Sequence, residues 1–242
     1  DIPLRLVGSE MCIRDRSREE QKGCINKSTK EPERVFGHGL PGSGKTQIMK
    51  WLSEYFQEVW GWRPGVQYVY LAPLNSMAAR INGYTVHSWA EVTWSKASPK
   101  GGMQSCIHSR GSTDMSSMSA KMELCRWLFI DEVEAVGAET LGIVNHNTSE
   151  AARPRLYKFR GGKEDPAHQR CYGGLNLCLF GDLWQLPPVL QMSISSNPYR
   201  PAANSSMLVR KIMEFFWGQD TDNGFTQPPF EFAVCKRITA RL

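Results

Sequence analysis

The segment Gly39–Thr46, GLPGSGKT, matches the pattern G-x-x-x-x-G-K-[ST] at every fixed position. Glycines in such a loop let backbone N–H groups wrap around phosphate oxygens, because glycine adopts left-handed backbone conformations readily. The Lys45 ammonium would reach the β- and γ-phosphates of a nucleotide, and the Thr46 hydroxyl would be offered to Mg²⁺. The candidate nucleotide-binding residues are Gly39, Gly42, Ser43, Gly44, Lys45 and Thr46. The alternative is a glycine-rich surface turn.

The segments on either side of this loop favour the phosphate site. The short run 34–36 before it can form a strand. After it, apolar residues recur at helical spacing, at Ile48, Leu52, Tyr55, Phe56 and Val59. Gly61 and Pro64 are helix stop signals. A strand, a loop and a helix are what this site requires, because the N-terminus of the helix adds its dipole to the phosphate site.

A carboxylate pair follows the apolar run of CRWLFIDE, residues 125–132. An uninterrupted apolar run is typical of a buried parallel strand, and ligands of open α/β sheets gather where such strands end. Asp131 is then the candidate Mg²⁺ ligand, and Glu132 the candidate base that polarises the attacking water. The alternative is that the two acids open the next helix as a cap.

GDLWQLPPV, residues 181–189, places Asp182 and Gln185 directly after a third apolar run, 175–180. Turn chemistry explains the glycine and the prolines but does not call for the acid and the amide. We expect this strand to deliver both side chains to the edge of the sheet where Asp131 lies. Gln185 would bond the γ-phosphate or the attacking water. For Trp184, core packing and contact with nucleic acid are equally open.

Composition sets outer bounds on the protein. Its 242 residues suit one large domain or two small ones, with 41% hydrophobic and 22% charged residues. The net charge of +5 is mild and compatible with a polyanionic partner. Seven cysteines without a CxxC indicate a reduced intracellular protein, not a disulfide framework or zinc module. The sequence contains no apolar run of the roughly 18 residues that a membrane span requires.

The chain divides into parts of different character. Residues 1–17 resemble the translation of a sequencing adapter, with an ordinary polar arm as the alternative, and they are left out of the fold prediction. Strands are expected near 34–38, 66–72, 126–131 and 175–181, with helices after most of them. A further helix is expected to include Met207, Leu208, Ile212, Phe215 and Phe216 and to end at Gly218. The Ser- and Gly-rich stretch 95–120 is expected to be an inserted loop.

These motifs, in this order, resemble those of the Pif1-like helicases of superfamily 1B, including the helicase modules of Helitron-type transposons. The stretch LAPLNSMAARINGYTVHSWA, residues 71–90, is similar to a family block of the form A-P-T-G-x-A-A followed by I-x-G-x-T-x-H-S. It departs at Leu74 and Asn75, where the pattern has Thr and Gly. The resemblance covers 19–242 in patches. It implies an α/β fold, a RecA-like P-loop NTPase domain with a mainly parallel sheet flanked by helices.

The resemblance implies three further roles. Gln21 lies where the family keeps an adenine-reading glutamine, although a solvated helix face explains a single glutamine equally well. Thr85, His87 and Ser88 lie in the block that contacts single-stranded DNA, whereas the residues alone also allow His87 to be a core histidine. Arg237 matches an arginine that reaches the γ-phosphate, although the glutamine that follows it in the family is replaced by Ile238.

The resemblance also sets the expected organisation and activity. Residues 18–242 are expected to be the first motor domain, with the family's second RecA-like domain absent from this sequence. The expected function is a 5′-to-3′ DNA helicase motor that uses Mg-ATP to move on single-stranded DNA. The alternative is a remnant that binds nucleotide or DNA without turnover. An intracellular protein, of the nucleus or the mitochondrion, is expected.

Overall fold

The protein is described by a computed structural model that covers residues 32–92, 112–153, 156–158, 164–166, 170–189, 191–196, 207–218, 220–221, 224–225 and 231–234. Within these residues, six strands form one sheet in the order β10-β1-β7-β4-β2-β3, and every neighbouring pair is parallel. They are β1 (Arg34–His38), β2 (Tyr68–Ala72), β3 (Tyr84–Thr85), β4 (Trp127–Ile130), β7 (Asn176–Gly181) and β10 (Glu231–Val234). The predicted α/β fold with a mainly parallel sheet is confirmed.

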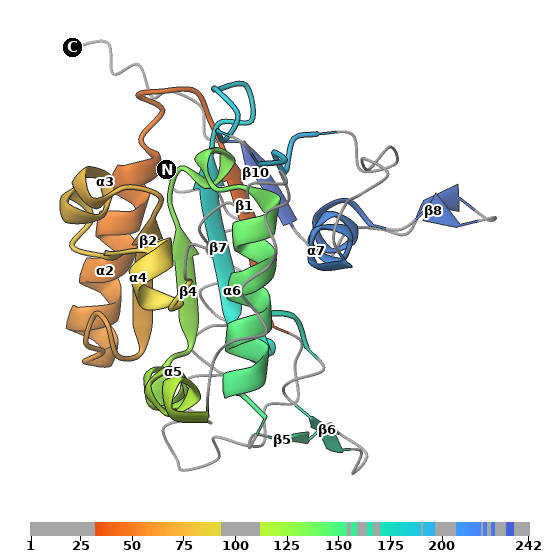
Figure 1. Ribbon diagram of the computed structural model, residues 1–242. Coiled ribbons are helices and arrows are strands. Elements are labelled where there is room, and N and C mark those ends of the chain that lie inside the picture. Colours follow the sequence, from red (N-terminus) through yellow and green to blue (C-terminus); the bar gives the residue numbers. More distant parts are fainter. Residues whose placement is uncertain are drawn as a thin grey trace.

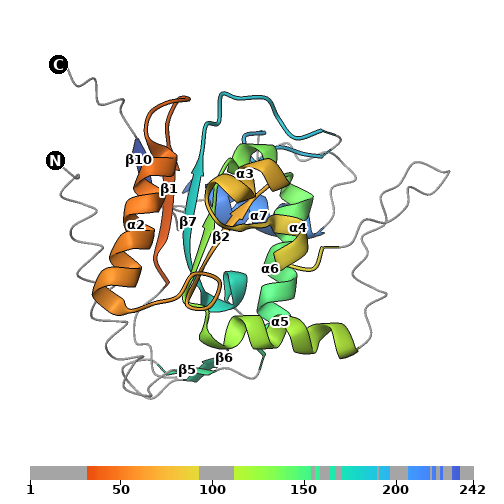
Figure 2. The same cartoon turned by 90° about the vertical axis from the view of Figure 1, so that its left-hand side faces the viewer.

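Helices cover both faces of this sheet (Figures 1 and 2). They are α2 (Lys45–Trp60), α3 (Asn75–Arg80), α4 (Val86–Trp89), α5 (Ser112–Leu124), α6 (Ala138–Ala151) and α7 (Met207–Trp217), with the 3-10 turns η2 (Val133–Ala135) and η4 (Cys171–Gly174). Two small antiparallel pairs lie outside the sheet, β5 (Leu156–Lys158) with β6 (Glu164–Pro166) and β8 (Asp220–Thr221) with β9 (Gly224–Phe225).

Each central strand buries both of its faces, which is why it reads as an unbroken apolar run. In β4, Trp127 and Phe129 join the core beneath α2, which also contains Met49 and Phe56. Leu128 and Ile130 point to the opposite face and join the core that α4, α5, α6 and α7 cover. Successive side chains of a strand point to opposite faces, so both cores meet on the same strand.

Two helices differ in detail from their predicted faces. In α2, Val59 was predicted to lie on the buried face but is exposed, and Met49 is buried instead. In α7, Met207 is exposed and Val209 and Met213 are buried instead. The helix itself ends before Gly218, as predicted. The spacing therefore located both helices, while the buried face is set by the sheet against which each one packs.

The stretch predicted as an inserted loop is partly helical. Residues 112–120 belong to α5, which is anchored by the buried side chains of Met118 and Met122 against the same core as α6. Residues 93–111 lie outside the described part of the chain. The sequence did not predict this helix because most of its residues are polar and only two methionines form its apolar face.

Candidate nucleotide and nucleic-acid site

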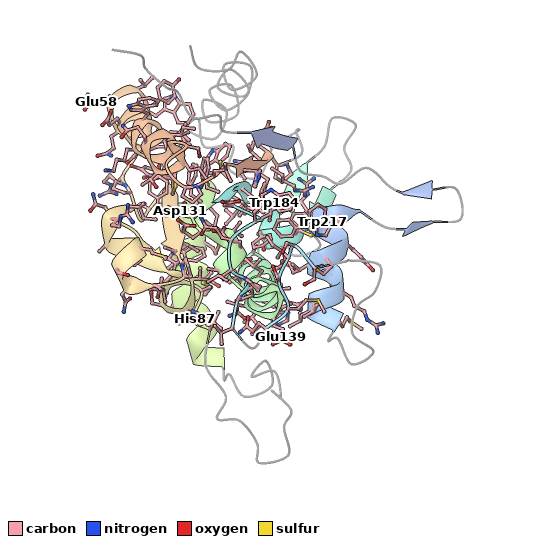
Figure 3. All side chains as sticks on the ribbon, turned by 90° about the horizontal axis from the view of Figure 1, so that it is seen from above. Glu58, His87, Asp131, Glu139, Trp184 and Trp217 are labelled. Atoms are coloured by element: carbon pink, nitrogen blue, oxygen red, sulfur yellow. The ribbon has the colours of Figure 1, made fainter. Side chains whose placement is uncertain are left out.

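The chemistry-bearing residues meet at one edge of the sheet, here called the carboxyl edge, where β1, β7, β4, β2 and β3 end. Parallel strands end together, so motifs far apart in sequence become neighbours. Figure 3 looks down on this edge and labels Asp131, Trp184 and His87. The strand order places the phosphate motifs on β1, β7 and β4, and the 71–90 block on the adjacent β2 and β3.

The P-loop leaves β1 and enters α2 as the pattern requires. Gly42 and Gly44 have φ of 76° and 94°, left-handed conformations that glycine adopts without strain. Open space faces the position that a side chain would take on either glycine. The loop is tied to β7 by the Gly39 N–H, which donates to the Gly181 carbonyl at 3.1 Å. The predicted strand–loop–helix arrangement is confirmed, with β1 before the loop and α2 after it.

Lys45 is held inside the loop rather than extended into solvent. Its side chain is 7% exposed, and its Nζ donates to the carbonyls of Gly39 at 2.5 Å and Leu40 at 3.3 Å. The Ser43 hydroxyl is buried and has no hydrogen-bond partner among the described residues. An orphaned hydroxyl and a cation folded onto its own loop both suit a phosphate, which accepts hydrogen bonds from each.

Asp131 lies directly beyond β4, and its N–H donates to the Leu71 carbonyl at 2.9 Å. The carboxyl is 6% exposed, and burial raises its pKa to about 6. The charge of Glu132 contributes to this rise of the Asp131 pKa, while the Glu132 N–H, Lys45 and Arg80 offset part of it. A buried carboxylate oxygen is a hard ligand of the kind that Mg²⁺ takes, and the two neighbouring cations would be satisfied by the phosphates that accompany the metal.

Glu132 has a left-handed backbone, with φ 50° and ψ 47°. Its N–H donates to the Asp131 carboxylate at 3.1 Å. Non-glycine residues adopt this conformation at a cost, and such residues cluster at functional sites. The two acids directly precede the 3-10 turn η2, of which Glu132 is the N-cap without a side-chain cap hydrogen bond, whereas α6 begins later, at Ala138, with Gly137 as its N-cap.

Asp182 and Gln185 lie in different environments after β7: Asp182 is buried inside the turn, and Gln185 is exposed on it. Asp182 is buried, and its carboxylate accepts the Trp184 N–H at 3.1 Å while its carbonyl accepts the Gln185 N–H at 2.9 Å. It therefore forms the turn that presents Gln185, whose side chain is exposed at the carboxyl edge. Trp184 is 83% exposed, so its core-packing alternative is wrong.

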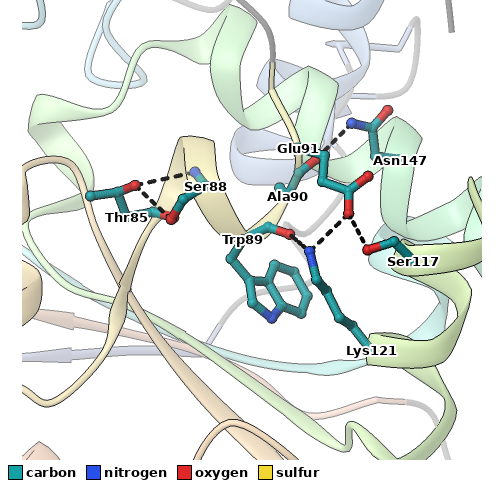
Figure 4. A network of polar contacts seen from close by, with 8 residues as sticks. All are labelled: Thr85, Ser88, Trp89, Ala90, Glu91, Ser117, Lys121 and Asn147. Carbon is teal, nitrogen blue, oxygen red and sulfur yellow. Dashed lines mark hydrogen bonds and ion pairs between the residues drawn. The ribbon is translucent and has the colours of Figure 1, made fainter. Parts of the chain in front are cut away.

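Thr85 and Ser88 form a local cap at the start of α4. The Thr85 hydroxyl accepts the Ser88 N–H at 3.1 Å and donates to the Ser88 hydroxyl at 2.8 Å (Figure 4). His87 is half-buried between them, and burial lowers the pKa of its imidazole. Ser88 is exposed and Thr85 is half-buried, while Nε2 of His87 is buried. Hydroxyl groups of this kind can donate to the phosphate and sugar oxygens of a nucleic acid.

A polar network fixes this turn from behind (Figure 4). Lys121 of α5 donates to the Trp89 carbonyl at 3.1 Å and pairs with Glu91 at 2.8 Å. Asn147 of α6 donates to the Ala90 carbonyl at 2.8 Å. Two helices that are distant in sequence therefore position the Thr85–Ser88 turn on the carboxyl edge.

The donor set at the phosphate end fits Mg²⁺. A half-buried hydroxyl, Thr46, and a buried carboxylate, Asp131, are hard oxygen ligands from two adjacent elements. Within the described residues, no group of three or more His, Cys, Asp or Glu side chains is placed to hold a metal ion. Few protein ligands are what Mg²⁺ uses when phosphates complete its shell.

Two predicted residues lie outside the described part of the chain, Gln21 and Arg237. Two others escaped the sequence prediction, Arg80 beside Asp131 and the buried acid Glu134. Neither belongs to a pattern, so spacing gave no signal for them. In the described residues no helix is long and apolar enough to cross a membrane.

No protein-family model matches the chain. It is 27% identical over 163 residues to the ATP-dependent DNA helicase Pif1 of Psychrobacter sp. (strain PRwf-1), covering 66% of this chain and 20% of that protein. It is 30% identical over 156 residues to the ATP-dependent DNA helicase PIF6 of Trypanosoma brucei brucei, covering 64% of this chain and 16% of that protein. The chain thus spans about a fifth of the length of the curated relatives it matches.

Among solved structures, the chain is similar to Bacteroides sp. Pif1 in complex with ADP-AlF4. The TM-score is 0.50 at 21% identity, over 93% of this chain and 43% of that one. This level of similarity concerns the fold, which is RecA-like in both. The partial matches in sequence and in fold agree, and they make this chain similar to part of a Pif1-type DNA helicase.

Proposed function

We propose that this chain is the ATP-hydrolysing motor domain of a Pif1-like 5′-to-3′ DNA helicase, acting with Mg²⁺ on single-stranded DNA. The observation that carries the proposal is the common carboxyl edge. The P-loop, the Asp131–Glu132 pair and Gln185 lie on three adjacent strands, β1, β4 and β7. The Thr85–Ser88 turn follows on β3 of the same sheet.

In the proposed mechanism, P-loop N–H groups and Lys45 bind the phosphates, and Lys45 exchanges its carbonyl partners for phosphate oxygens. Thr46 and Asp131 would hold Mg²⁺, which neutralises charge on the phosphates when it is bound. Glu132 accepts a proton from the attacking water, and Gln185 orients that water from the end of β7. Loss of the γ-phosphate then releases Gln185 and the turn that Asp182 shapes.

One support for the cellular setting comes from the cysteines of the chain. Cys125, Cys171 and Cys178 form no disulfide among the described residues, which is typical of a reducing compartment. We include an intracellular location, nucleus or mitochondrion, in the proposal. A second RecA-like domain is the proposed partner of the carboxyl edge, where Leu40, Trp184, Leu186 and Val189 are exposed. Exposed apolar clusters mark interaction surfaces.

Replacing Lys45 with alanine is expected to weaken ATP binding roughly 10- to 150-fold, because a charge-assisted contact with phosphate is lost. Titration of a fluorescent ATP analogue measures the change. Lys50→Ala is the matched control, since this lysine is exposed one turn further along α2. Equal affinity of the wild type and Lys45→Ala would refute the nucleotide site.

Replacing His87 with alanine is expected to weaken binding of single-stranded DNA roughly 5- to 150-fold, the range for one lost stacking contact. ATP affinity should not change, because the turn lies on β3 and not beside the P-loop. Fluorescence anisotropy with a labelled oligonucleotide measures DNA binding, which should also fall with salt. His146→Ala on α6 is the control, being another half-buried histidine. If only folding stability changes in His87→Ala, the histidine belongs to the core.

A further inference from the structure

The loop that carries Gln185 is attached to the rest of the protein near both of its ends. We call residues 182–189, which follow β7, the Gln185 loop. Near its start, the Leu183 N–H donates to Nδ1 of His38 at 3.4 Å. His38 is the last residue of β1 and stands directly before the P-loop. This first contact joins the Gln185 loop to the strand that carries the nucleotide site.

The second attachment, here called the α6 anchor, lies after the Gln185 loop. The hydroxyl of Thr140, a residue that is 3% exposed, donates to Oε1 of Gln191 at 2.9 Å. The Ala138 N–H, in the first turn of α6, donates to the Met192 carbonyl at 2.8 Å. Because α6 follows Glu132 through the turn η2, the α6 anchor connects the Gln185 loop to the segment that carries the candidate base.

Close packing, and not backbone conformation, accounts for the glycine at the α6 anchor. Gly137, the N-cap of α6, has φ −67° and ψ 149°, values that any residue adopts. A Cβ added to Gly137 would collide with Oε1 and Cβ of Gln191 and would lie 2.6 Å from its Cδ. The Gln191 side chain therefore packs directly on the backbone at the start of α6, where it has little room to shift.

The chain between the two attachments is stiff. Pro187 and Pro188 have φ angles fixed by their rings. Before them, the Asp182 carbonyl accepts the Gln185 N–H at 2.9 Å and closes a turn. Gln185 can therefore move little without Gln191, and a change at the α6 anchor is passed along the loop.

We propose that Gln191 is a positioning residue, seated on α6 by the Thr140 hydroxyl and by Gly137, so that the loop presents Gln185 to the attacking water. The inference rests on the proposed role of Gln185 in ATP hydrolysis. Gln191 acts through the loop and not on the nucleotide. Because the same end of α6 follows Glu132, the α6 anchor also fixes Gln185 relative to the base.

Two substitutions of Thr140 separate the hydrogen bond from packing. Thr140→Val keeps the shape but removes the donor to Gln191, whereas Thr140→Ser keeps the donor. Thr140→Val should slow single-turnover ATP hydrolysis by on the order of 10- to 100-fold, the effect of a displaced catalytic group, with ATP affinity unchanged. Thr140→Ser should hydrolyse ATP close to the wild-type rate. A wild-type rate in Thr140→Val, or equal slowing in both variants, would overturn the proposal.

Gly137→Ala tests the α6 anchor by a second route. Alanine suits the backbone at this position but would push Gln191 away from α6. Hydrolysis should fall as in Thr140→Val, with ATP affinity retained. The melting temperature of each preparation separates loss of folding from loss of positioning. A folded Gly137→Ala protein with the wild-type rate would contradict the inference.

A double-mutant cycle tests whether Thr140 acts through Gln185. If it does, Thr140→Val should not slow hydrolysis further in a Gln185→Ala background, because the group that it positions is already missing. Rate losses that multiply would show independent effects and refute the positioning role. Thr148→Val is the matched control, since Thr148 is a buried threonine of the same helix whose hydroxyl donates at 2.8 Å to the Val144 carbonyl. Its hydrolysis rate should equal that of the wild type.

Fluorine-19 NMR of 5-fluorotryptophan-labelled protein reports on the loop without ATP. Trp184 precedes Gln185 and is 83% exposed, and its resonance is identified by its loss in Trp184→Phe. Thr140→Val and Gln191→Ala should change the position or width of this resonance, whereas Thr140→Ser and Thr148→Val should not. An unchanged resonance in Thr140→Val would overturn the proposal. If the resonance changes as expected but the wild-type chain hydrolyses no ATP, the proposed function fails while the α6 anchor of the loop stands.

Discussion

Replacing Glu132 with glutamine is expected to leave ATP binding intact and to slow hydrolysis by on the order of 10²–10⁴-fold. Glutamine keeps the size and polarity of the side chain but cannot accept the proton of the attacking water. The P-loop and Lys45, which lie on β1 and α2, are untouched by the change. Single-turnover hydrolysis with the protein in excess over ATP measures the rate, and a fluorescent ATP analogue measures binding.

Two further variants make this result specific. Glu139→Gln, in the first turn of α6, removes a comparably exposed acid outside the site and should hydrolyse ATP like the wild type. Asp131→Asn should instead lose Mg²⁺-dependent binding, since it removes the proposed metal ligand. If Asp131→Asn spares that binding while Glu132→Gln abolishes it, the two roles are reversed. Binding without hydrolysis in the wild type would favour the non-catalytic remnant.

The second large effect concerns the open carboxyl edge. Residues 18–242 by themselves are expected to bind ATP, to turn it over very slowly, and not to unwind DNA. Gln185 is exposed there, and Trp184 and Leu186 are 83% and 86% exposed. Charges next to water stabilise a phosphoryl-transfer transition state poorly. An arginine supplied by a covering domain is worth about 10³–10⁵ in rate in comparable systems.

The assay is unwinding of a 5′-tailed duplex, with ATP hydrolysis followed in the same preparation. Lys45→Ala serves as the control that assigns any turnover to this site. Little stimulation of hydrolysis by single-stranded DNA is expected, because one domain cannot grip the strand alternately with another. ATP-dependent unwinding by monomeric 18–242 would refute both the proposed partner domain and the architecture from which it was inferred.

Local chemistry made much of this protein readable from its sequence. The P-loop needs particular residues at fixed spacing, so Lys45 and Thr46 are visible without a fold. The central strands are buried on both faces, so each shows as an apolar run, and β4 and β7 were placed within about two residues. Asp131 and Gln185 were predicted because chemistry-bearing residues follow the ends of such runs.

Strand order was decided only in the tertiary structure. Pairing inserts β7 between β1 and β4, which joins the end of β7 at Gly181, shortly before Gln185, to the P-loop at Gly39 although about 140 residues separate them. No local pattern states which strands become neighbours, because pairing depends on burial of both faces by distant helices. The edge strands β3 and β10 were not predicted, for the same reason. Both are short, and each is defined by its pairing with one neighbouring strand.

The solvent exposure of individual side chains likewise could not be predicted from the sequence. Trp184 is large and apolar, and its exposure follows only from the turn that Asp182 imposes beyond the sheet. Glu134 is charged by type, and a lone acid in sequence predicts a solvated position. It is buried because η2 folds it onto Gly181, whose missing side chain leaves the space. Spacing along the chain determines which groups exist at the carboxyl edge, and packing determines their solvent exposure and their pKa.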